Sequence, residues 1–313
     1  MDSNAIDHTN MKRLIFIPLL IFSILCNAQF TKSGGTFLKS GNAFISTPAE
    51  DLYCDQYDAI LAAMGTDPTG DTIDWQNDLV YSLDSAGFFD RTKLLYMPVA
   101  ASSLSDSYIN WAKPGTYNLS TGNAPAFDRV RGWDADGTAD YLNSGWIPAS
   151  DSLLDNHTAG VGVNDMTLAA WSLSNVDGDY CVMGTNMGGT GLELFPNMGD
   201  NLYSRINTGE LSSLGDIYTA GGTIAFLMAT RRGGAEVESY RNGAHLGNHT
   251  DASDQLISTY PLYVLRTNYT GGSDYASYFD GVISIVLVMD QVSDAEADAI
   301  YDIFHRYMTR IGL

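Results

Sequence analysis

The stretch Tyr278–Phe304 reads YFDGVISIVLVMDQVSDAEADAIYDIF and decides the fold. Between Val282 and Met289, apolar side chains occupy both sets of alternating positions. One set is Ile283, Ile285, Leu287 and Met289, and the other is Val282, Val286 and Val288. Successive side chains of a strand point to opposite faces, so neither face of this strand can contact water. The pattern predicts a central strand in a sheet that is covered on both sides.

The second half of the stretch predicts an amphipathic C-terminal helix. Ser293 can cap its N-terminus, and Glu296, three residues later, completes a capping box. The apolar positions that follow have helical spacing: Ile300, Ile303, Phe304, Tyr307 and Ile311. This stripe needs an apolar surface to cover, and the outer face of a β-sandwich provides one.

Four segments carry a family resemblance. F-D-G-x-I followed by the apolar strand and S-D-A-E-A-x-x-I-Y resembles the C-terminal end of laminin G-like, concanavalin A-like jelly-roll domains. YRNGAHLGN at 240–248 resembles a hairpin of that family, with Asn242-Gly243 suited to a type I′ turn. MTLAAWSL at 166–173 and ADGTADYLNSG at 135–145 resemble its opening strands. The resemblance spans about 131–311 and implies a mainly-β, concanavalin A-like jelly-roll sandwich.

The chain divides into four segments by composition and by the spacing of its apolar residues. We expect a leader and signal peptide at 1–28, a linker at 29–53, a small helical N-terminal subdomain at 54–115, and the sandwich with its C-terminal helix at 116–313. Helical spacing after Cys54, and a second helix capped by Asp74, indicate the subdomain. The candidate strands are Leu94–Ala100, Ala139–Gly145, Met166–Ser174, Asp179–Gly184, Gly191–Phe195, Leu202–Ile206, Thr223–Arg231, Glu236–Arg241 and Pro261–Thr267.

A secretory signal peptide is predicted from Met11 to Ala28. Lys12-Arg13 precedes an apolar run, Leu14–Leu25, and small or polar residues come before a cleavage site after Ala28. The run is too short to span a bilayer. We therefore expect a secreted or cell-surface protein that does not span the membrane, with Met1 or Met11 as the start.

The region before the sandwich carries a second resemblance. AILAAMG, SLDSAGFFDRTKLLYMPVAA and INWAKPGTYNLS are similar to segments of bacteriophage structural and tail-associated proteins and of some secreted bacterial proteins. This similarity implies a virion location as the alternative, with other virion or cell-surface proteins as partners.

The net charge of −21 excludes one class of partner. A phosphate backbone or an anionic membrane surface would be repelled, so we expect no nucleic acid ligand. Of the 37 acidic residues, 31 are Asp, which favours turns and loops of a β-protein.

Two cysteines outside the signal peptide, Cys54 and Cys181, allow two alternatives. An oxidising compartment favours a disulfide between them, and burial of both as free thiols is the other outcome.

No catalytic residues are predicted. A glycosidase on this fold needs paired carboxylates on one face of a strand. Glu236 and Glu238 share a face but lack a third acid in register, and Glu193 has no partner nearby in the sequence. A polar, exposed face of an edge strand explains the pair better, and a glycoside hydrolase remains the weakest functional alternative.

One acidic cluster has the character of a metal site. The cluster consists of Asp134, Asp136 and Asp140, with Gly137 directly after Asp136. Their carboxylates could hold calcium, although no cofactor is required. The alternative is a tight turn at Asp136-Gly137, which needs no ion.

Aromatic residues next to Gly, Asp and Asn are the candidates for a binding site. Sugar rings pack on flat aromatic faces, and Asp or Asn side chains accept hydrogen bonds from the sugar hydroxyls. The candidates are Trp133, Trp146, Tyr269, Tyr275 and Asp274. They predict a non-catalytic extracellular recognition module for polysaccharide or a glycosylated surface. A virion structural or adhesin protein is the alternative.

Overall fold

The chain forms two compact units, Met1–Leu52 and Tyr53–Leu313. The computed structural model describes residues 37–40, 43–46, 53–150, 165–176, 178–188, 190–198, 200–208, 212–216, 224–232, 236–250, 258–269 and 277–313. The predicted signal peptide lies outside these residues. The predicted linker contains a hairpin, in which β1 (Phe37–Ser40) pairs antiparallel with β2 (Ala43–Ser46).

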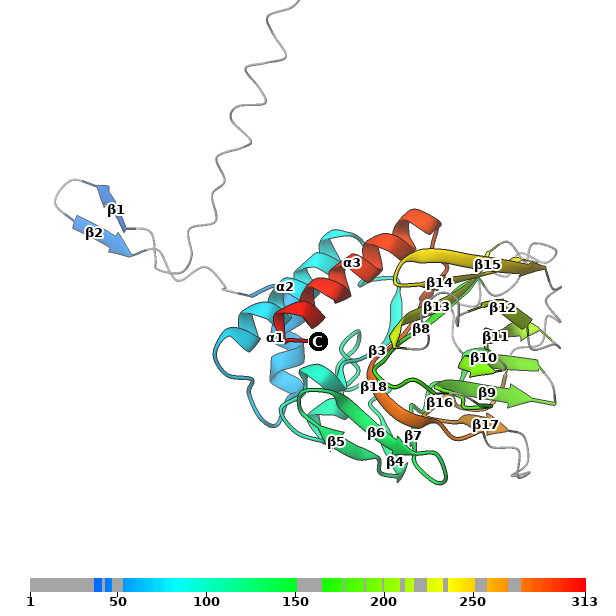
Figure 1. Ribbon diagram of the computed structural model, residues 1–313. Coiled ribbons are helices and arrows are strands. Elements are labelled where there is room, and N and C mark those ends of the chain that lie inside the picture. The colour runs from blue at the N-terminus through cyan, green and yellow to red at the C-terminus, as the bar shows by residue number, and fades with distance from the viewer. Residues whose placement is uncertain are drawn as a thin grey trace, which may run out of the picture. The chain divides into compact units, whose positions relative to one another are not determined.

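The second unit contains two eight-stranded sheets in its described part (Figure 1). The helix-side sheet has the order β15 (Ala244–Thr250), β14 (Glu236–Arg241), β13 (Ala225–Arg232), β8 (Met166–Ser172), β18 (Asp280–Asp290), β6 (Gly132–Asp136) and β5 (Ala126–Asp128), with β3 (Thr92–Tyr96) also on β18. The outer sheet has the order β12 (Ser212–Asp216), β11 (Asn201–Thr208), β10 (Thr190–Met198), β9 (Met183–Met187), β16 (Tyr263–Val264), β7 (Tyr141–Asn143) and β4 (Ser120–Asn123), with β17 (Thr267–Tyr269) also on β9. The predicted mainly-β sandwich is confirmed.

Most predicted strands are present, with shifted ends. The candidate Pro261–Thr267 divides into β16 and β17, because Leu265 turns the chain with φ +68°. The candidate Leu94–Ala100 ends as a strand at Tyr96, and a 3₁₀ turn, η2 (Pro98–Ala100), follows it. Two further 3₁₀ turns are η3 (Asp106–Tyr108) and η4 (Pro148–Ser150).

Strand β18 is central, as predicted. It pairs with β8 along one side, and with β6 and then β3 along the other. Its inner face packs between the sheets through Ile283, Val286 and Val288. Its outer face packs under the helices through Ile285, Leu287 and Met289.

The prediction that Ile283 shares a face with Ile285, Leu287 and Met289 is wrong, because Ile283 packs between the sheets and the other three pack under the helices. The register against β8 shifts between Ile283 and Ile285, so Ser284 forms a bulge and the alternation reverses there. The Ser284 hydroxyl donates to the Arg131 carbonyl over 2.6 Å. Gly132 has φ +110°, and a Cβ on it would lie 2.2 Å from the Ile283 carbonyl oxygen, so only glycine allows β6 to approach this closely.

A helical layer covers the outer face of the helix-side sheet (Figure 1). It consists of α1 (Asp55–Ala63), α2 (Asp71–Ser85) and α3 (Asp294–Arg310). The second helix begins at Asp71 instead of after a cap at Asp74, because Gly70, with φ +63°, turns the chain into it. No described helix is both long and apolar enough to cross a membrane.

The segment 54–115 is not a separate helical subdomain. Strand β3 lies within it and pairs with β18 over Tyr96–Thr92, inside the sandwich sheet. The helices α1 and α2 share one apolar core with α3 and with the outer face of that sheet. The unit Tyr53–Leu313 therefore has two cores, one on each face of a single sheet.

The start of α3 is fixed by the predicted capping box and by two arginines. The Ser293 hydroxyl accepts the Glu296 N–H, and the Glu296 carboxylate accepts the Ser293 N–H over 2.7 Å. Arg91 binds the other oxygen of Glu296. These contacts connect the chain before β3 to the C-terminal helix.

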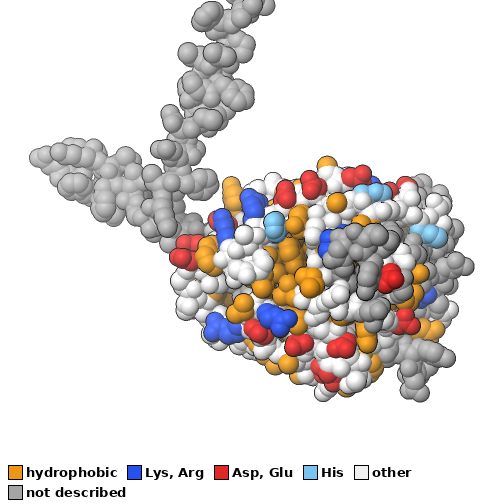
Figure 2. All heavy atoms as spheres, viewed as in Figure 1, with side chains coloured by type: hydrophobic (Ala, Val, Ile, Leu, Met, Phe, Trp, Pro, Cys, Tyr) orange, Lys and Arg blue, Asp and Glu red, His pale blue; other side chains and the backbone are white. Residues whose placement is uncertain are grey.

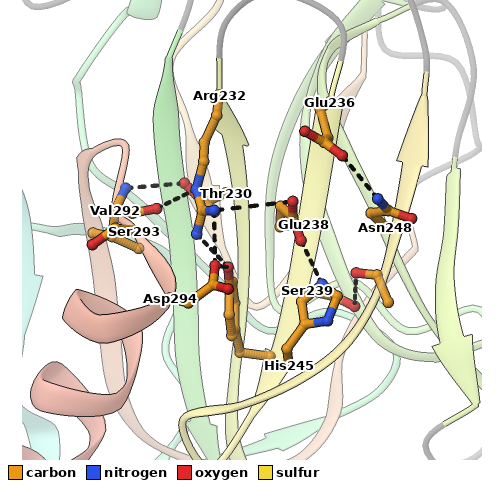
Figure 3. Close-up of polar contacts among 12 residues, drawn as sticks. Thr230, Arg232, Glu236, Glu238, Ser239, His245, Asn248, Val292, Ser293 and Asp294 are labelled. Carbon is orange, nitrogen blue, oxygen red and sulfur yellow. Dashed lines mark hydrogen bonds and ion pairs between the residues drawn. The ribbon is translucent and has the colours of Figure 1, made fainter.

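The second arginine, Arg232, holds the same helix end to the sheet (Figure 3). Its guanidinium pairs with Asp294 over 2.8 Å and donates to the Tyr240 hydroxyl. That hydroxyl donates to Asp294 over 2.8 Å. These hydrogen bonds lower the pKa of Asp294, with the bond from Tyr240 as the largest cause.

The hairpin between β14 and β15 has the predicted turn. Asn242 and Gly243 have φ +52° and +77°, and positive values at both central positions are those of a type I′ turn. This turn closes a hairpin at the sheet edge.

Glu296→Gln should destabilise the protein by about 1 kcal/mol at neutral pH, since it removes the charge from a capping bond and an ion pair. Burial raises the pKa of Glu296, but the bonds from Ser293 and Arg91 outweigh it, so the pKa is lowered. A lowered pKa gives stability that is present above the unfolded-state pKa and lost as pH falls through the folded-state value. The difference between wild type and variant should therefore vanish in acid.

Urea unfolding across pH measures this difference. Asp302→Asn, an exposed carboxylate on the same helix, is the control and should change little. A Glu296→Gln penalty that persists undiminished in acid would contradict the assigned role of the charge.

Candidate functional site

Two of the predicted binding residues are core residues. Trp133 lies on β6 and Trp146 follows β7, and both are 0% exposed. The Trp133 indole N–H donates to the Ser107 hydroxyl over 2.8 Å, and its ring packs near Tyr96 and Tyr108. Neither ring can stack on a ligand here, so both predictions are wrong. Gly132 and Asp134 lie in β6 itself, and Gly145 turns the chain after β7, so these neighbours do not mark binding loops.

The other aromatic candidates belong to one segment. Tyr269 ends β17 and is half-buried, whereas Asp274 and Tyr275 lie outside the described residues. An isolated bridge between Arg266 and Tyr278 brackets this segment. The structure therefore places the base of the predicted loop at Arg266 and Tyr278.

A tyrosine-arginine cluster, defined as Tyr141, Tyr263, Arg266 and Tyr278, lies at that base. The rings of Tyr141 and Tyr263 stack with centroids 5.0 Å apart and planes 24° apart. The Arg266 guanidinium carbon lies 4.6 Å from the Tyr141 centroid, 5.4 Å from Tyr263 and 4.8 Å from Tyr278. All four side chains are half-buried, so each keeps a surface in contact with solvent.

The alternation of two short strands places the cluster on the outward face of the outer sheet. Leu142 and Val264 point into the core, so Tyr141, Asn143 and Tyr263 point away from it. The cluster was not predicted from the sequence, although the alternation Tyr-Leu-Asn at 141–143, within a candidate strand, places Tyr141 and Asn143 on the face opposite Leu142.

The backbone at Leu265 places Arg266. Leu265 has φ +68°, a left-handed conformation that costs a non-glycine residue about 1 kcal/mol. Its side chain is fully buried next to that of Val264, so two successive residues point inward. Its N–H donates to the Val182 carbonyl over 2.6 Å, and its carbonyl accepts the Phe279 N–H over 2.8 Å. This turn leaves Arg266 among the outward-facing tyrosines.

The cluster retains hydrogen-bonding capacity. Arg266 uses Nε on the Thr267 carbonyl and Nη1 on the Tyr278 hydroxyl, which leaves further guanidinium N–H groups. Burial, and then the neighbouring Tyr141, raise the pKa of Tyr263 more than Arg266 lowers it. The net effect is a raised pKa, so this phenol stays neutral and can donate a hydrogen bond. The arrangement offers aromatic faces and polar donors together.

The acidic cluster forms a turn. One oxygen of Asp136 accepts the N–H groups of Thr138 and Ala139, each over 2.9 Å, and the other accepts the Thr138 hydroxyl. Asp140 accepts the Asp136 N–H and the Asn123 amide. These bonds from Ala139 and Thr138 hold the pKa of Asp136 well below its usual range. No group of three or more His, Cys, Asp or Glu in the described residues is placed to hold a metal ion.

The paired glutamates are held by neighbours on their own sheet (Figure 3). Glu238 is buried and contacts His245 and, at 3.9 Å, Arg232. Glu236 is exposed and accepts the Asn248 amide over 2.8 Å. The predicted exposed edge holds for Glu236 only. The edge strand is β15, and the carboxylate of Glu238 lies against His245 and Arg232.

The two cysteines are free thiols. Cys54 is half-buried before α1, and Cys181 is fully buried beside β9, so the disulfide alternative is wrong in this structure. Burial, and then the nearby Glu193, raise the pKa of Cys181. Glu193 is itself buried and paired with Arg205 over 2.5 Å, and its pKa is raised because burial outweighs the ion pair.

No protein-family model matches the chain, and no curated protein matches it. Among solved structures it is similar to the receptor-binding domain of botulinum neurotoxin D, with 12% identity, 68% of this chain and 53% of that chain covered, and a TM-score of 0.44. It is similar to a botulinum neurotoxin type C structure, a toxin whose cell entry depends on two ganglioside molecules, with 12% identity, coverage of 70% and 52%, and a TM-score of 0.47.

A third similar structure is domain 4 of AbnA, an extracellular arabinanase from Geobacillus stearothermophilus, in complex with arabinotriose. Identity is 12%, coverage is 67% of this chain and 98% of that domain, and the TM-score is 0.41. The chain spans about half the length of the two toxin structures. At this level of similarity, neither the ligands nor the binding residues of these proteins transfer to this chain.

Calcium and a chelator should both leave the melting temperature unchanged, because the Asp136 oxygens already accept backbone and hydroxyl hydrogens. Asp136→Ala should lower the melting temperature equally with and without calcium, as measured by differential scanning calorimetry. Asp90→Ala, which removes an exposed carboxylate outside the cluster, is the control. A melting temperature that calcium raises in wild type and not in Asp136→Ala would establish a metal site instead.

In the protein without its predicted signal peptide, reduction should leave the intact mass unchanged. A thiol reagent should modify Cys54 before Cys181 in the folded state, since Cys181 is 0% exposed and its raised pKa keeps it protonated. In denaturant the two thiols should react at similar rates. A mass increase on reduction would contradict the free thiols.

Proposed function

We propose that this chain is a non-catalytic recognition module that binds polysaccharide or a glycosylated surface through the tyrosine-arginine cluster. The observation that carries the proposal is the stacked, half-buried pair Tyr141 and Tyr263 on the outward face of a sandwich sheet, with Arg266 against both rings. A sugar ring presents C–H groups to an aromatic face and hydroxyls at its rim, and this cluster offers partners for both.

Polar groups next to the rings fit the same ligand. Asn143 shares the outward face with Tyr141, and its side-chain oxygen accepts the Gly145 N–H over 2.8 Å. Its amide nitrogen remains a donor toward solvent. The predicted loop candidates Tyr269, Asp274 and Tyr275 continue the chain from Arg266 and would extend the site.

An open aromatic surface of this kind should bind weakly. Most sugar hydroxyls keep exchanging with water at such a site, so little free energy remains after the cost of association. Several copies on one particle or cell would give useful attachment by raising the effective concentration. This expectation suits a secreted, cell-surface or virion protein, and it makes a multivalent assay necessary.

Tyr263→Ala should weaken glycan binding roughly fivefold, as expected for the loss of about 1 kcal/mol of aromatic contact. The measurement is binding of a streptavidin-tetramerised protein to a glycan array, followed by titration of the best glycan. Tyr141→Ala should act in the same direction. Tyr203→Ala, a half-buried tyrosine on β11 of the same sheet, is the matched control and should bind as wild type.

Three outcomes would contradict all or part of the proposal. Absence of binding to any glycan in the multivalent format would favour a structural protein whose sandwich packs against neighbours. Release of reducing sugar from a polysaccharide panel would contradict the non-catalytic assignment. Equal losses for Tyr263→Ala and Tyr203→Ala would remove the site from the cluster while leaving glycan binding in place.

A further inference from the structure

Two adjoining pockets lie at the helical end of the second unit. One, of about 450 Å³, is lined by the loop before α2, η2, the β5–β6 turn and the last turn of α3. The other, of about 140 Å³, lies between α2 and α3. Trp75, Tyr307 and Arg310 line both, so the two pockets meet at these side chains, and together they are called the groove.

The groove has an apolar wall that a flat ring can contact. Val99, Ala101, Val130 and Ile311 line the larger pocket together with Trp75. Trp75 is half-buried, whereas the four other tryptophans are at most 7% exposed. Val130 is 55% exposed, so its side chain is open to contact with an apolar ligand surface. A ring-shaped ligand could cover both side chains.

The same groove is positively charged in a strongly acidic protein. Arg129 and Arg310 line the larger pocket, and Arg306 lines the smaller one. The lining residues include a single acid, Asp78, which pairs with Arg310 over 2.7 Å. The whole chain carries a net charge of −21, so this local excess of arginine opposes the general field. In Figure 2, Lys and Arg side chains likewise gather on the side of the viewed face toward α1, α2 and β5.

Hydroxyl groups complete the lining next to the N-terminus of α2. Thr69, Thr72 and Ser102 supply hydroxyls to the larger pocket. The first residue before α2 is Gly70, so no side chain caps this helix. Asp71 and Asp74 lie in the same first turn and already compensate the partial positive charge of the helix N-terminus, so the hydroxyls, and not the helix end, are what this edge offers a ligand.

We propose that this groove binds a carboxylate carried on a ring with an apolar face. The ring would stack on Trp75 and contact Val130, and Arg129 would bind the carboxylate with support from the hydroxyls. Such a carboxylate could come from a uronic acid unit of a polysaccharide or from a free aromatic acid. None of the residues of the tyrosine-arginine cluster line the groove, so either site can fail while the other stands.

The first experiment titrates the purified chain with a naphthalene carboxylate and with its uncharged amide. Tryptophan fluorescence reports binding, because the half-buried Trp75 is the indole most open to a ligand. We expect quenching by the carboxylate, absent in Trp75→Phe, and binding of the amide weaker by about tenfold, the loss of one charge-assisted hydrogen bond. Equal binding of carboxylate and amide would overturn the proposal, as would absence of binding by both.

The second experiment tests the arginine. Arg129→Gln should weaken carboxylate binding by about tenfold and leave amide binding unchanged. Arg131→Gln, an exposed arginine two residues away that does not line the groove, is the matched control. Both are surface substitutions, and unchanged melting temperatures would show that the fold is retained. Equal losses in the two variants would show a general charge effect and overturn the site.

A third titration separates the two sources. A galacturonate oligosaccharide that binds more tightly than the naphthalene carboxylate, with the same dependence on Arg129, would identify the acidic polysaccharide. The reverse order would identify a free aromatic acid. An oligosaccharide whose binding depends on Tyr263 and not on Arg129 would belong to the tyrosine-arginine cluster and would count against the groove as its site.

Discussion

The structure depends on one strand whose two faces must both be kept from water. Every apolar side chain of β18 from Ile283 to Met289 is at most 2% exposed. Burial at about 25 cal/mol per Å² makes such a strand strongly stabilising only if both of its faces find apolar partners. The outer sheet covers one face and the three helices cover the other. The sandwich and the helical layer are therefore consequences of the same stretch of sequence.

This double requirement explains why the N-terminal helices share one core with α3 and the sandwich sheet. The outer face of β18 needs more cover than α3 alone provides, and α1 and α2 supply it. Strand β3 then pairs directly with β18, and Arg91 reaches the capping box of α3. Chain segments about 200 residues apart thus meet at one helix end. Their mutual dependence favours cooperative unfolding of the whole unit.

Periodicity predicted what depends on local pattern. The doubly apolar strand, the capping box and the Asn242-Gly243 turn are each specified within a few residues, and all three are confirmed. Periodicity did not predict features that depend on residues far away in the sequence. The bulge at Ser284 arises from pairing with β8, and the burial of Trp133 depends on Ser107. The tyrosine-arginine cluster joins strands more than 100 residues apart, which no local pattern contains.

The chain has 16 Lys and Arg residues and 37 acidic residues, so the positions of the few arginines are informative. Buried cations are costly unless they are paired or hydrogen-bonded, and Arg205 and Arg231 each make at least one such contact. Arg231 donates to the Ile206 carbonyl over 2.6 Å, and Arg205 pairs with Glu193. In a chain with such an excess of acidic residues, an exposed arginine has many carboxylates of the same chain with which it can pair. Arg129 and Arg306 instead border a groove whose single acid already pairs with Arg310, which leaves their charges directed toward solvent and toward any anion it carries.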